Sequence, residues 1–195
     1  MKQVFSFIII IFAAMAMAFK PAVTSLEVDT NASIGVWKGY KVTGEHTGTV
    51  KIKKGNIILT DGILTGGRVE IDMTTIKNID MDGEYALKLE NHLKSDDFFG
   101  TANFPTSKFE LNRAIAQDSK GTYKLVGNLT IKETTKEVKC IAKLSQNGST
   151  MTLKGKLTID RSEFNVKYGS GSFFDGLGDK TINDEFDLEF NLVTK

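Results

Sequence analysis

The sequence predicts an all-β fold: an antiparallel β-barrel of about eight strands with one short helical excursion, at about residues 84–100, near one end. Three observations lead to this prediction. From Val28 onward, apolar and charged residues alternate with a period of two, turn signals separate the alternating stretches, and one segment breaks the pattern. These features are typical of sequential hairpins that close on themselves.

The alternating stretches supply the strands. Val50 and Ile52 alternate with Lys51 and Lys53, and the ranges 34–42 and 56–64 add further strands. Later stretches place the following apolar or small residues on one face: Val69, Ile71, Met73, Phe109, Leu111, Tyr123, Leu125, Gly127, Leu129, Ile131, Val138, Cys140, Ala142, Leu144, Met151, Leu153, Gly155, Leu157, Ile159, Phe186, Leu188, Phe190 and Leu192. Strands with one apolar and one charged face form a closed barrel or a two-sheet sandwich, and we expect the barrel because a meander of hairpins closes easily.

Turn signals lie between the alternating stretches and make successive strands antiparallel. They are Lys54-Gly55-Asn56, Asp61-Gly62, Gly66-Gly67, Lys132–Lys136 and Gln146-Asn147-Gly148-Ser149. The last is a strong short-hairpin signal because Asn-Gly favours the tight turns that join two strands.

The segment Leu89–Glu110 interrupts the strands. The charges and apolar residues of Glu84–Ser95 are spaced as in a short helix, which Asp96–Gly100 then ends. Phe98 and Phe99 on this turn either point into a hollow interior or simply close a core.

The chain has the length and composition of one globular domain, with 195 residues, 41% hydrophobic and 25% charged. Lys2, the apolar run Val4–Phe12 and the alanines at 14, 16 and 18 have the layout of a secretory signal peptide. We expect residues 1–18 to be removed, leaving a single domain over 19–195 that is periplasmic or secreted. A retained N-terminal anchor is the alternative, although the run is shorter than the roughly 20 residues of a membrane span, and no later segment is that long.

Charge argues against a nucleic-acid partner. The chain has 25 basic and 24 acidic residues, and Lys2 is the only charged residue of 1–18, so the processed chain is formally neutral. Proteins that bind nucleic acid show a basic excess or stripe.

The sequence offers little for catalysis or metal binding. His46 and His92 are the only histidines, and neither lies on an alternating inward face, so we expect their replacement by alanine to leave bound ligand unchanged. The acidic loop 175–184 departs from the spacing of an EF-hand, and we expect no metal. Cys140 lies on the inward face, where burial keeps a thiol neutral. We therefore expect a protein that is not an enzyme.

Small residues on the inward face indicate room for a ligand or, alternatively, bends in the strands. They are Gly127, Gly155, Ala142 and Cys140. With no acid or mid-strand lysine facing inward, we expect the ligand to be a hydrocarbon chain. The expected lipid-binding residues are Val69, Ile71, Met73, Phe98, Phe99, Phe109, Leu111, Leu125, Gly127, Leu129, Cys140, Ala142, Met151, Leu153, Gly155, Leu157, Phe186, Leu188 and Phe190. Arg113 and Arg161 follow in phase at the ends of strands, either as contacts to a polar head group or as surface cations.

Four segments resemble the YceI-like, polyisoprenoid-binding family, in that family's order. They are WKGYKVTGEHTG (37–48), HLKSDDFFGTANFPTSKFE (92–110), GNLTIKETTKEV (127–138) and IDRSEFNV (159–166). The resemblance covers nearly all of the chain after residue 25. It implies a lipocalin-like barrel that holds a long apolar lipid, such as a quinone or polyprenol, without a covalent cofactor, and it is compatible with a homodimer.

We therefore expect a secreted or periplasmic carrier or reservoir for such a lipid. The alternative is a solid-cored interaction or stress-response module that binds no small molecule.

Overall fold

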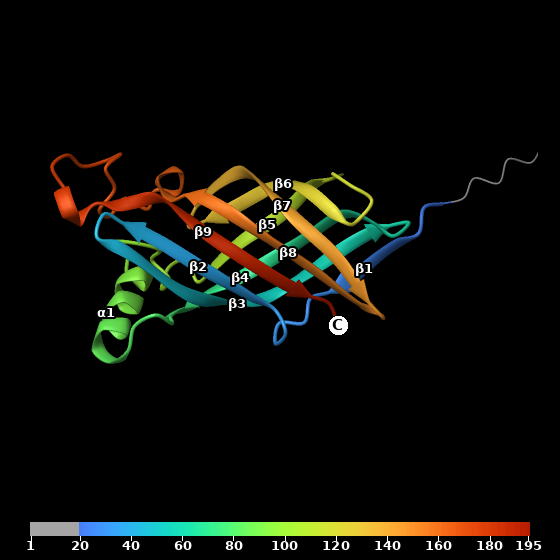
Figure 1. The fold of residues 1–195 in the computed structure, drawn as a ribbon, viewed down its shortest axis with the longest axis horizontal. Helices are drawn as coiled ribbons and strands as arrows, with labels where there is room; N and C mark the ends of the chain where they lie inside the picture. The colour runs from blue at the N-terminus through green and yellow to red at the C-terminus, as the bar shows by residue number, and fades with distance from the viewer. Residues whose placement is uncertain (1–19) are drawn as a thin grey trace, which may run out of the picture.

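Eight antiparallel strands close into a barrel, as the alternation predicts, and an additional strand and a helix lie at its ends (Figure 1). The structure, a computed structural model, describes residues 20–195. The barrel strands are β2 (Ile34–Lys41), β3 (Gly44–Thr60), β4 (Ile63–Asn78), β5 (Thr106–Ala116), β6 (Thr122–Ile131), β7 (Thr134–Asn147), β8 (Thr150–Asp160) and β9 (Ile182–Val193). The expected signal peptide lies outside the described residues.

The barrel is a meander of antiparallel strands that closes where β2 pairs with β9, the last strand in the chain. Strands β3 to β9 pair with their sequence neighbours, and β2 pairs with both β3 and β9. Trp37 of β2 therefore lies between Gly48 of β3 and Leu188 of β9. The short strand β1 (Val23–Glu27) pairs with the far end of β3, beyond the region that β2 covers.

Two of the predicted turns are wrong, because β3 and β4 run continuously through them. Gly55 pairs with Val69 and Gly67 with Ile57, in a stretch of regular pairing that lies between two register shifts of these strands. A Cβ atom at Gly55 would lie 2.8 Å from the carbonyl oxygen of Arg68, and one at Gly67 would lie 2.6 Å from that of Asn56. Glycine here permits a close approach of two strands rather than a chain reversal.

The helix α1 (Gly83–Lys94) confirms the helix predicted over Glu84–Ser95 to within one residue at each end. Ala86 and Leu93 are buried, and the carboxylate of Glu90 accepts a hydrogen bond of 2.9 Å from the backbone N–H of Asn78 on β4. The turns that follow bury Phe98 and Phe99. The buried side chains of Ala86 and Leu93 and the hydrogen bond between Asn78 and Glu90 thus hold the helix against the barrel.

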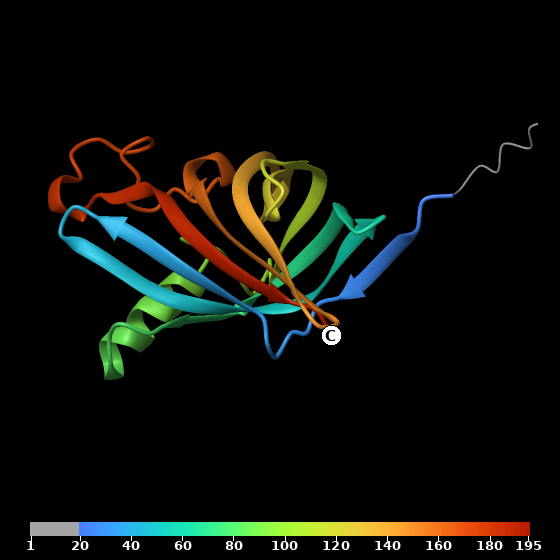
Figure 2. The same cartoon turned by 45° about the vertical axis from the view of Figure 1, so that its right-hand side comes forward.

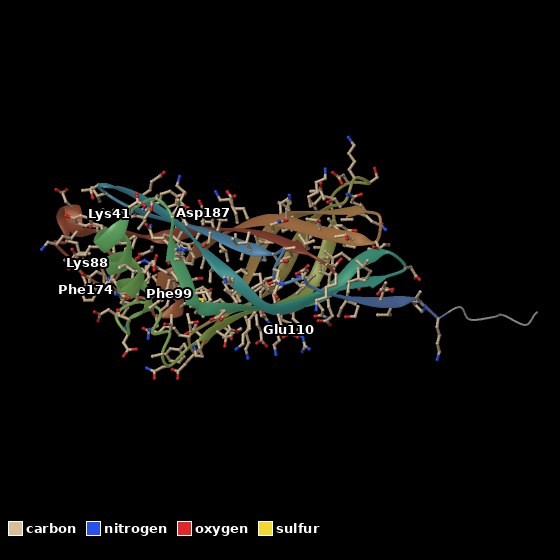
Figure 3. All side chains as sticks on the ribbon, turned by 90° about the horizontal axis from the view of Figure 1, so that it is seen from below. Lys41, Lys88, Phe99, Glu110, Phe174 and Asp187 are labelled. Atoms are coloured by element: carbon tan, nitrogen blue, oxygen red, sulfur yellow. The ribbon has the colours of Figure 1, made fainter. Side chains whose placement is uncertain are left out.

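We call one end of the barrel the helical end. There α1, the β2–β3 turn at residues 42–43 and the β8–β9 connection at 161–181 lie together, while β1 extends from the opposite end (Figures 1 and 2). The connection contains two short 3-10 helices, η1 (Arg161–Phe164) and η2 (Gly178–Lys180). Lys41, Lys88 and Phe174 mark the helical end in Figure 3. Within residues 20–195 no helix has both the length and the apolar character needed to span a membrane.

Candidate functional site

A cavity of about 260 Å³ lies inside the barrel at the helical end. Its wall comes from β2, β3, β4, α1, β5, β6, β8, β9 and the turns after α1. The lining residues are Trp37, Gly39, Tyr40, Lys41, His46, Val50, Ile71, Met73, Ile76, Leu89, His92, Leu93, Phe98, Phe99, Ser107, Leu129, Ile131, Ile159, Arg161, Ile182, Asn183, Phe186 and Leu188. Most of these side chains are hydrocarbon. An apolar cavity of roughly 150 Å³ already binds a benzene-sized molecule, so this one accepts an apolar ligand.

Gly39 helps to keep this end hollow. It follows Gly35 and Trp37 in the inward phase of β2 and is paired with Phe186 of β9. A Cβ atom at Gly39 would have no heavy atom within 4 Å, and the residue lines the cavity. A larger residue here would extend into free space.

The opposite half of the barrel is filled. A Cβ atom at Gly155 would lie 2.5 Å from the ring of Phe190, its cross-strand partner, and one at Gly127 would lie 2.5 Å from the ring of Phe109. The expectation that these inward glycines leave room for a ligand is therefore wrong. Each glycine instead makes space for a phenyl ring of the neighbouring strand.

The structure brings together only part of the predicted site. Ile71, Met73, Phe98, Phe99, Leu129, Phe186, Leu188 and Arg161 line the cavity. Val69, Phe109, Leu111, Leu125, Gly127, Cys140, Ala142, Met151, Leu153, Gly155, Leu157, Phe190 and Arg113 do not. Apart from Gly127 and Arg113, the residues in this second set belong to the packed core or contact it. Strand phase separates inward from outward residues, but it does not tell which half of a barrel is hollow.

Sequence reasoning missed several lining residues. Trp37 and Gly39 lie in the family-like segment at 37–48, where the alternation of apolar and charged residues is weak. Leu89 and His92 belong to α1, which covers one end of the barrel. Alternation along strands identifies inward residues of strands only, so it does not identify these two. Strand phase alone predicts that both histidines lie away from the ligand site, yet His46 and His92 line the cavity.

Aromatic side chains form the wall of the cavity at the helical end. The rings of Phe98 and Phe99 meet edge to face with centroids 5.1 Å apart, and Phe99 meets Phe186 of β9 at 6.2 Å. His92 lies edge to face against Phe98 at 5.7 Å and against Tyr168 at 4.4 Å. These contacts connect α1, the following turn, β9 and the β8–β9 connection, so the wall is shared by segments distant in sequence.

Arg161 is a buried cation whose hydrogen-bonding groups are already engaged. It is 2% exposed, and its guanidinium donates to the carbonyl oxygens of Asn183, Val166 and Ile182 at 2.8–3.0 Å. It also lies 3.4 Å from a carboxylate oxygen of Asp184. Burial lowers the pKa of Arg161, against the opposing effect of Asp184. Arg161 therefore closes the β8–β9 connection onto the barrel.

Of the two arginines predicted to contact a head group, Arg161 reaches the cavity wall and Arg113 does not. The guanidinium carbon of Arg161 lies 5.3 Å from the ring centre of Phe98. Arg113 is exposed on β5 and lines no part of the cavity.

Polar residues lie where β3 meets the segment before α1. The Nδ1 atom of His46 is 3.2 Å from Oδ2 of Asp80, and the side-chain amide of Asn78 donates to Oδ1 of the same carboxylate. Burial would raise the pKa of Asp80, but the hydrogen bonds from Asn78 and His46 outweigh it, and the pKa is lowered. Asp80 is thus an ionised partner for His46 at neutral pH.

Cys140 behaves as the sequence suggests, although it lies away from the cavity. It is buried in the packed half of the barrel, and burial raises the pKa of its thiol to about 11. Among residues 20–195 there is also no cluster of three His, Cys, Asp or Glu side chains arranged to hold a metal.

The sequence matches one family model and one curated protein. The model of the YceI-like domain family matches residues 22–194. A UPF0312 protein of Shewanella denitrificans is 33% identical over 75 residues, a match that covers 38% of this chain and 37% of that protein's length. The aligned region is therefore little more than a third of that relative.

Solved structures share the fold at low identity. BcnA of Burkholderia cenocepacia superposes with a TM-score of 0.71 at 23% identity, covering 86% of this chain and 99% of that one. A polyisoprenoid binding domain from Saccharophagus degradans, implicated in plant cell wall breakdown, gives 0.64 at 14% identity, covering 90% and 99%. The YCEI protein of Campylobacter jejuni gives 0.52 at 18%, covering 68% and 73%. At these identities the likeness shows a common fold.

Proposed function

The chain belongs to the YceI-like domain family, and from that membership and its cavity we propose that it is a carrier or reservoir for a long apolar lipid held inside the barrel. A polyisoprenoid, such as a quinone or a polyprenol, is the class we favour. The observation that carries the proposal is the apolar cavity at the helical end, where Gly39 lines the wall and has free space beside it. The polyisoprenoid binding domain of Saccharophagus degradans, which shares the fold, supports the choice of ligand.

The driving force for binding is burial of hydrocarbon. Each CH₂ group that leaves water contributes about 0.8 kcal/mol, so an apolar chain needs no directed contact to bind such a wall. A carrier also needs no catalytic group, and the proposal includes none. A solid-cored module, the alternative expected from the sequence, would fill the space that this barrel leaves open.

The size of the cavity limits how a long ligand is held. At about 260 Å³ it lies just below the roughly 300–1,000 Å³ of small-molecule pockets. A polyisoprenoid that exceeds this volume has to extend out of the cavity or widen it. Met73 is flexible and polarisable, and Leu89 and Leu93 belong to a helix that covers the barrel end, so this wall is the part suited to adapt.

Native mass spectrometry of the purified full chain, followed by organic extraction, tests the proposal. We expect an apolar species that co-purifies at one molecule per chain and is removed by extraction. A protein that carries no lipid, and takes none up from a polyprenol or quinone presented on cyclodextrin, would contradict it.

A further inference from the structure

Exposed large apolar side chains gather at the helical end of the barrel. Among residues 20–195, twelve large apolar residues are exposed, and seven of them belong to the β2–β3 turn, to α1 and the segment before it, or to the β8–β9 connection. These seven residues, which we call the apolar rim, are Val42, Ile79, Tyr85, Leu87, Tyr168, Phe173 and Phe174. They include every exposed aromatic residue of 20–195. Apolar residues gathered in this way mark a surface that another molecule covers.

The apolar rim lies around the opening of the cavity. Lys41 and Asn183 line the cavity and are both exposed, so the cavity reaches the surface at this end. The backbone N–H of Val42 donates to the carbonyl oxygen of Thr181 at 3.3 Å, which places the β2–β3 turn beside the β8–β9 connection. A molecule that covers the apolar rim therefore also lies over the opening.

The helix α1 belongs to both the cavity and the rim. Leu89 and His92 line the cavity, whereas Tyr85 and Leu87 are 76% and 58% exposed. The ring of His92 packs edge to face against Tyr168 of the β8–β9 connection. The apolar surface of the rim is thus continuous with the wall that would hold an apolar ligand.

A lysine accompanies the rim on each of its three segments. Lys41, Lys88 and Lys167 are exposed, and each is next to a rim residue in the sequence (Figure 3). The Nζ atom of Lys167 lies 5.0 Å from the ring centre of Phe173. At the surface of a bilayer, aromatic and aliphatic side chains enter the apolar region while neighbouring lysines extend their ammonium groups to the lipid phosphates. This pairing of apolar side chains with lysines fits a phospholipid surface.

Acidic residues on the same segments limit the part that charge can play. Glu84, Asp175 and Asp179 are exposed there, so the helical end is of mixed charge. Burial of the apolar rim is therefore the main driving force for docking. A second copy of the chain would have to match the shape of three separate segments, whereas a bilayer accommodates protruding apolar side chains in any arrangement.

We propose that the helical end docks on a phospholipid bilayer, with the apolar rim inserted among the lipids and the opening of the cavity facing the membrane. This inference rests on the proposed function, because a long apolar ligand is held in membranes and is expelled from water. Docking in this orientation lets the ligand pass between the bilayer and the cavity without crossing water.

Sedimentation of the full chain with phosphatidylcholine vesicles tests the docking surface. The double variants Tyr85→Gln/Leu87→Gln and Phe173→Ser/Phe174→Ser alter the rim on α1 and on the β8–β9 connection. The matched control is Ile141→Gln, since Ile141 is 54% exposed on the outer wall of β7. We expect the unaltered protein and the control to bind the vesicles, also at high salt, and each double variant to bind at least about tenfold more weakly.

Uptake of a polyprenol from cyclodextrin, which needs no membrane, is measured on the same proteins. All variants should take it up as the unaltered chain does, which also shows that they fold. Equal vesicle binding by all variants, or no vesicle binding by a chain that takes up polyprenol, would overturn the docking surface alone. A dimer that the double variants dissociate, seen by light scattering, would also overturn it, because the rim would then cover a second copy. Failure to take up polyprenol from cyclodextrin would contradict the proposed function and the inference with it.

Discussion

Asp187 shows how single side chains stabilise the outer surface of the barrel (Figure 3). Its carboxylate accepts hydrogen bonds from Tyr40 at 2.6 Å and Thr158 at 2.7 Å, and Lys156 lies 2.8 Å away. Burial would raise the pKa of Asp187, but the hydrogen bonds from Lys156, Tyr40 and Thr158 lower it to about 2. The carboxylate thus joins β2, β8 and β9, the strands through which the barrel closes.

This pKa predicts how stability depends on pH. Because the folded pKa lies below the ordinary value of 3.8, the ionised carboxylate stabilises the fold above about pH 4, and this contribution is lost as the pH falls toward 2. The loss amounts to about 2 kcal/mol at most. Urea unfolding of the full chain at pH 5 and pH 2.5 measures it. The Asp187→Asn variant should show a smaller difference between the two pH values, and an unchanged difference would exclude Asp187 as its source.

Two inward glycines make opposite predictions for the same substitution. At Gly155 a Cβ atom would meet the ring of Phe190 and the carbonyl oxygen of Ile141, at 2.5 and 2.8 Å, so Gly155→Ala should destabilise the protein by about 1–3 kcal/mol. Gly39→Ala meets nothing and should be neutral or slightly stabilising. Thermal melts of the two delipidated variants make the comparison. Equal melting temperatures would show that the two halves of the barrel do not differ in packing as described.

At the scale of the element, β3 and β4 depend on glycine where they approach each other. Gly67 has a φ of +153° and lies against the carbonyl oxygen of Asn56, whereas its neighbour Gly66 has only ordinary contacts with Ile58. We expect Gly67→Ala to lower the free energy of unfolding by at least about 1 kcal/mol and Gly66→Ala to change it by less than half of that. Urea denaturation decides this, and a similar cost at both positions would mean that the close approach is not what requires glycine.

The same elements show what a sequence can predict. The alternation in β5 to β9 gives strands, faces and antiparallel order correctly, because side-chain period is a local property. The sequence predicts turns at Gly55 and Gly67 because glycine marks both a turn and a close approach of two strands, and only the pairing of β3 with β4 distinguishes the two cases. The hollow end could not be predicted for a similar reason. Whether Gly39 or Gly155 faces free space depends on where the rings of Phe186 and Phe190 lie, and this is set by long-range packing.

At the scale of the whole molecule, the barrel has a packed half and a hollow half. The cavity is lined by residues of α1 and of the β8–β9 connection, the segments that lie at the helical end of the ribbon (Figure 2). Under the proposed function, ligand exchange takes place at the helical end, at the end of the barrel opposite to β1.

The N-terminal segment carries a prediction of its own. We expect the exported protein to begin at Phe19 or within a few residues of it, because the alanines at 14, 16 and 18 form overlapping small-residue cleavage sites. Intact-mass measurement of protein released from cells reads this directly. A full-length mass recovered with membranes would instead indicate a retained anchor.

An apolar ligand in the cavity beside Gly39, as we propose, would lie next to Trp37, whose fluorescence allows the ligand to be observed there. Trp37 is the only tryptophan of the sequence and lines the cavity. The direct measurement is a fluorescence titration of the delipidated full chain with an isoprenoid that carries a nitroxide quencher, beside the same titration of Gly39→Leu. We predict saturable quenching of Trp37 at one ligand per chain, and weak quenching in Gly39→Leu although its melting temperature is preserved. Ligand that binds the unaltered protein without quenching Trp37, or that binds Gly39→Leu equally well, would contradict the account.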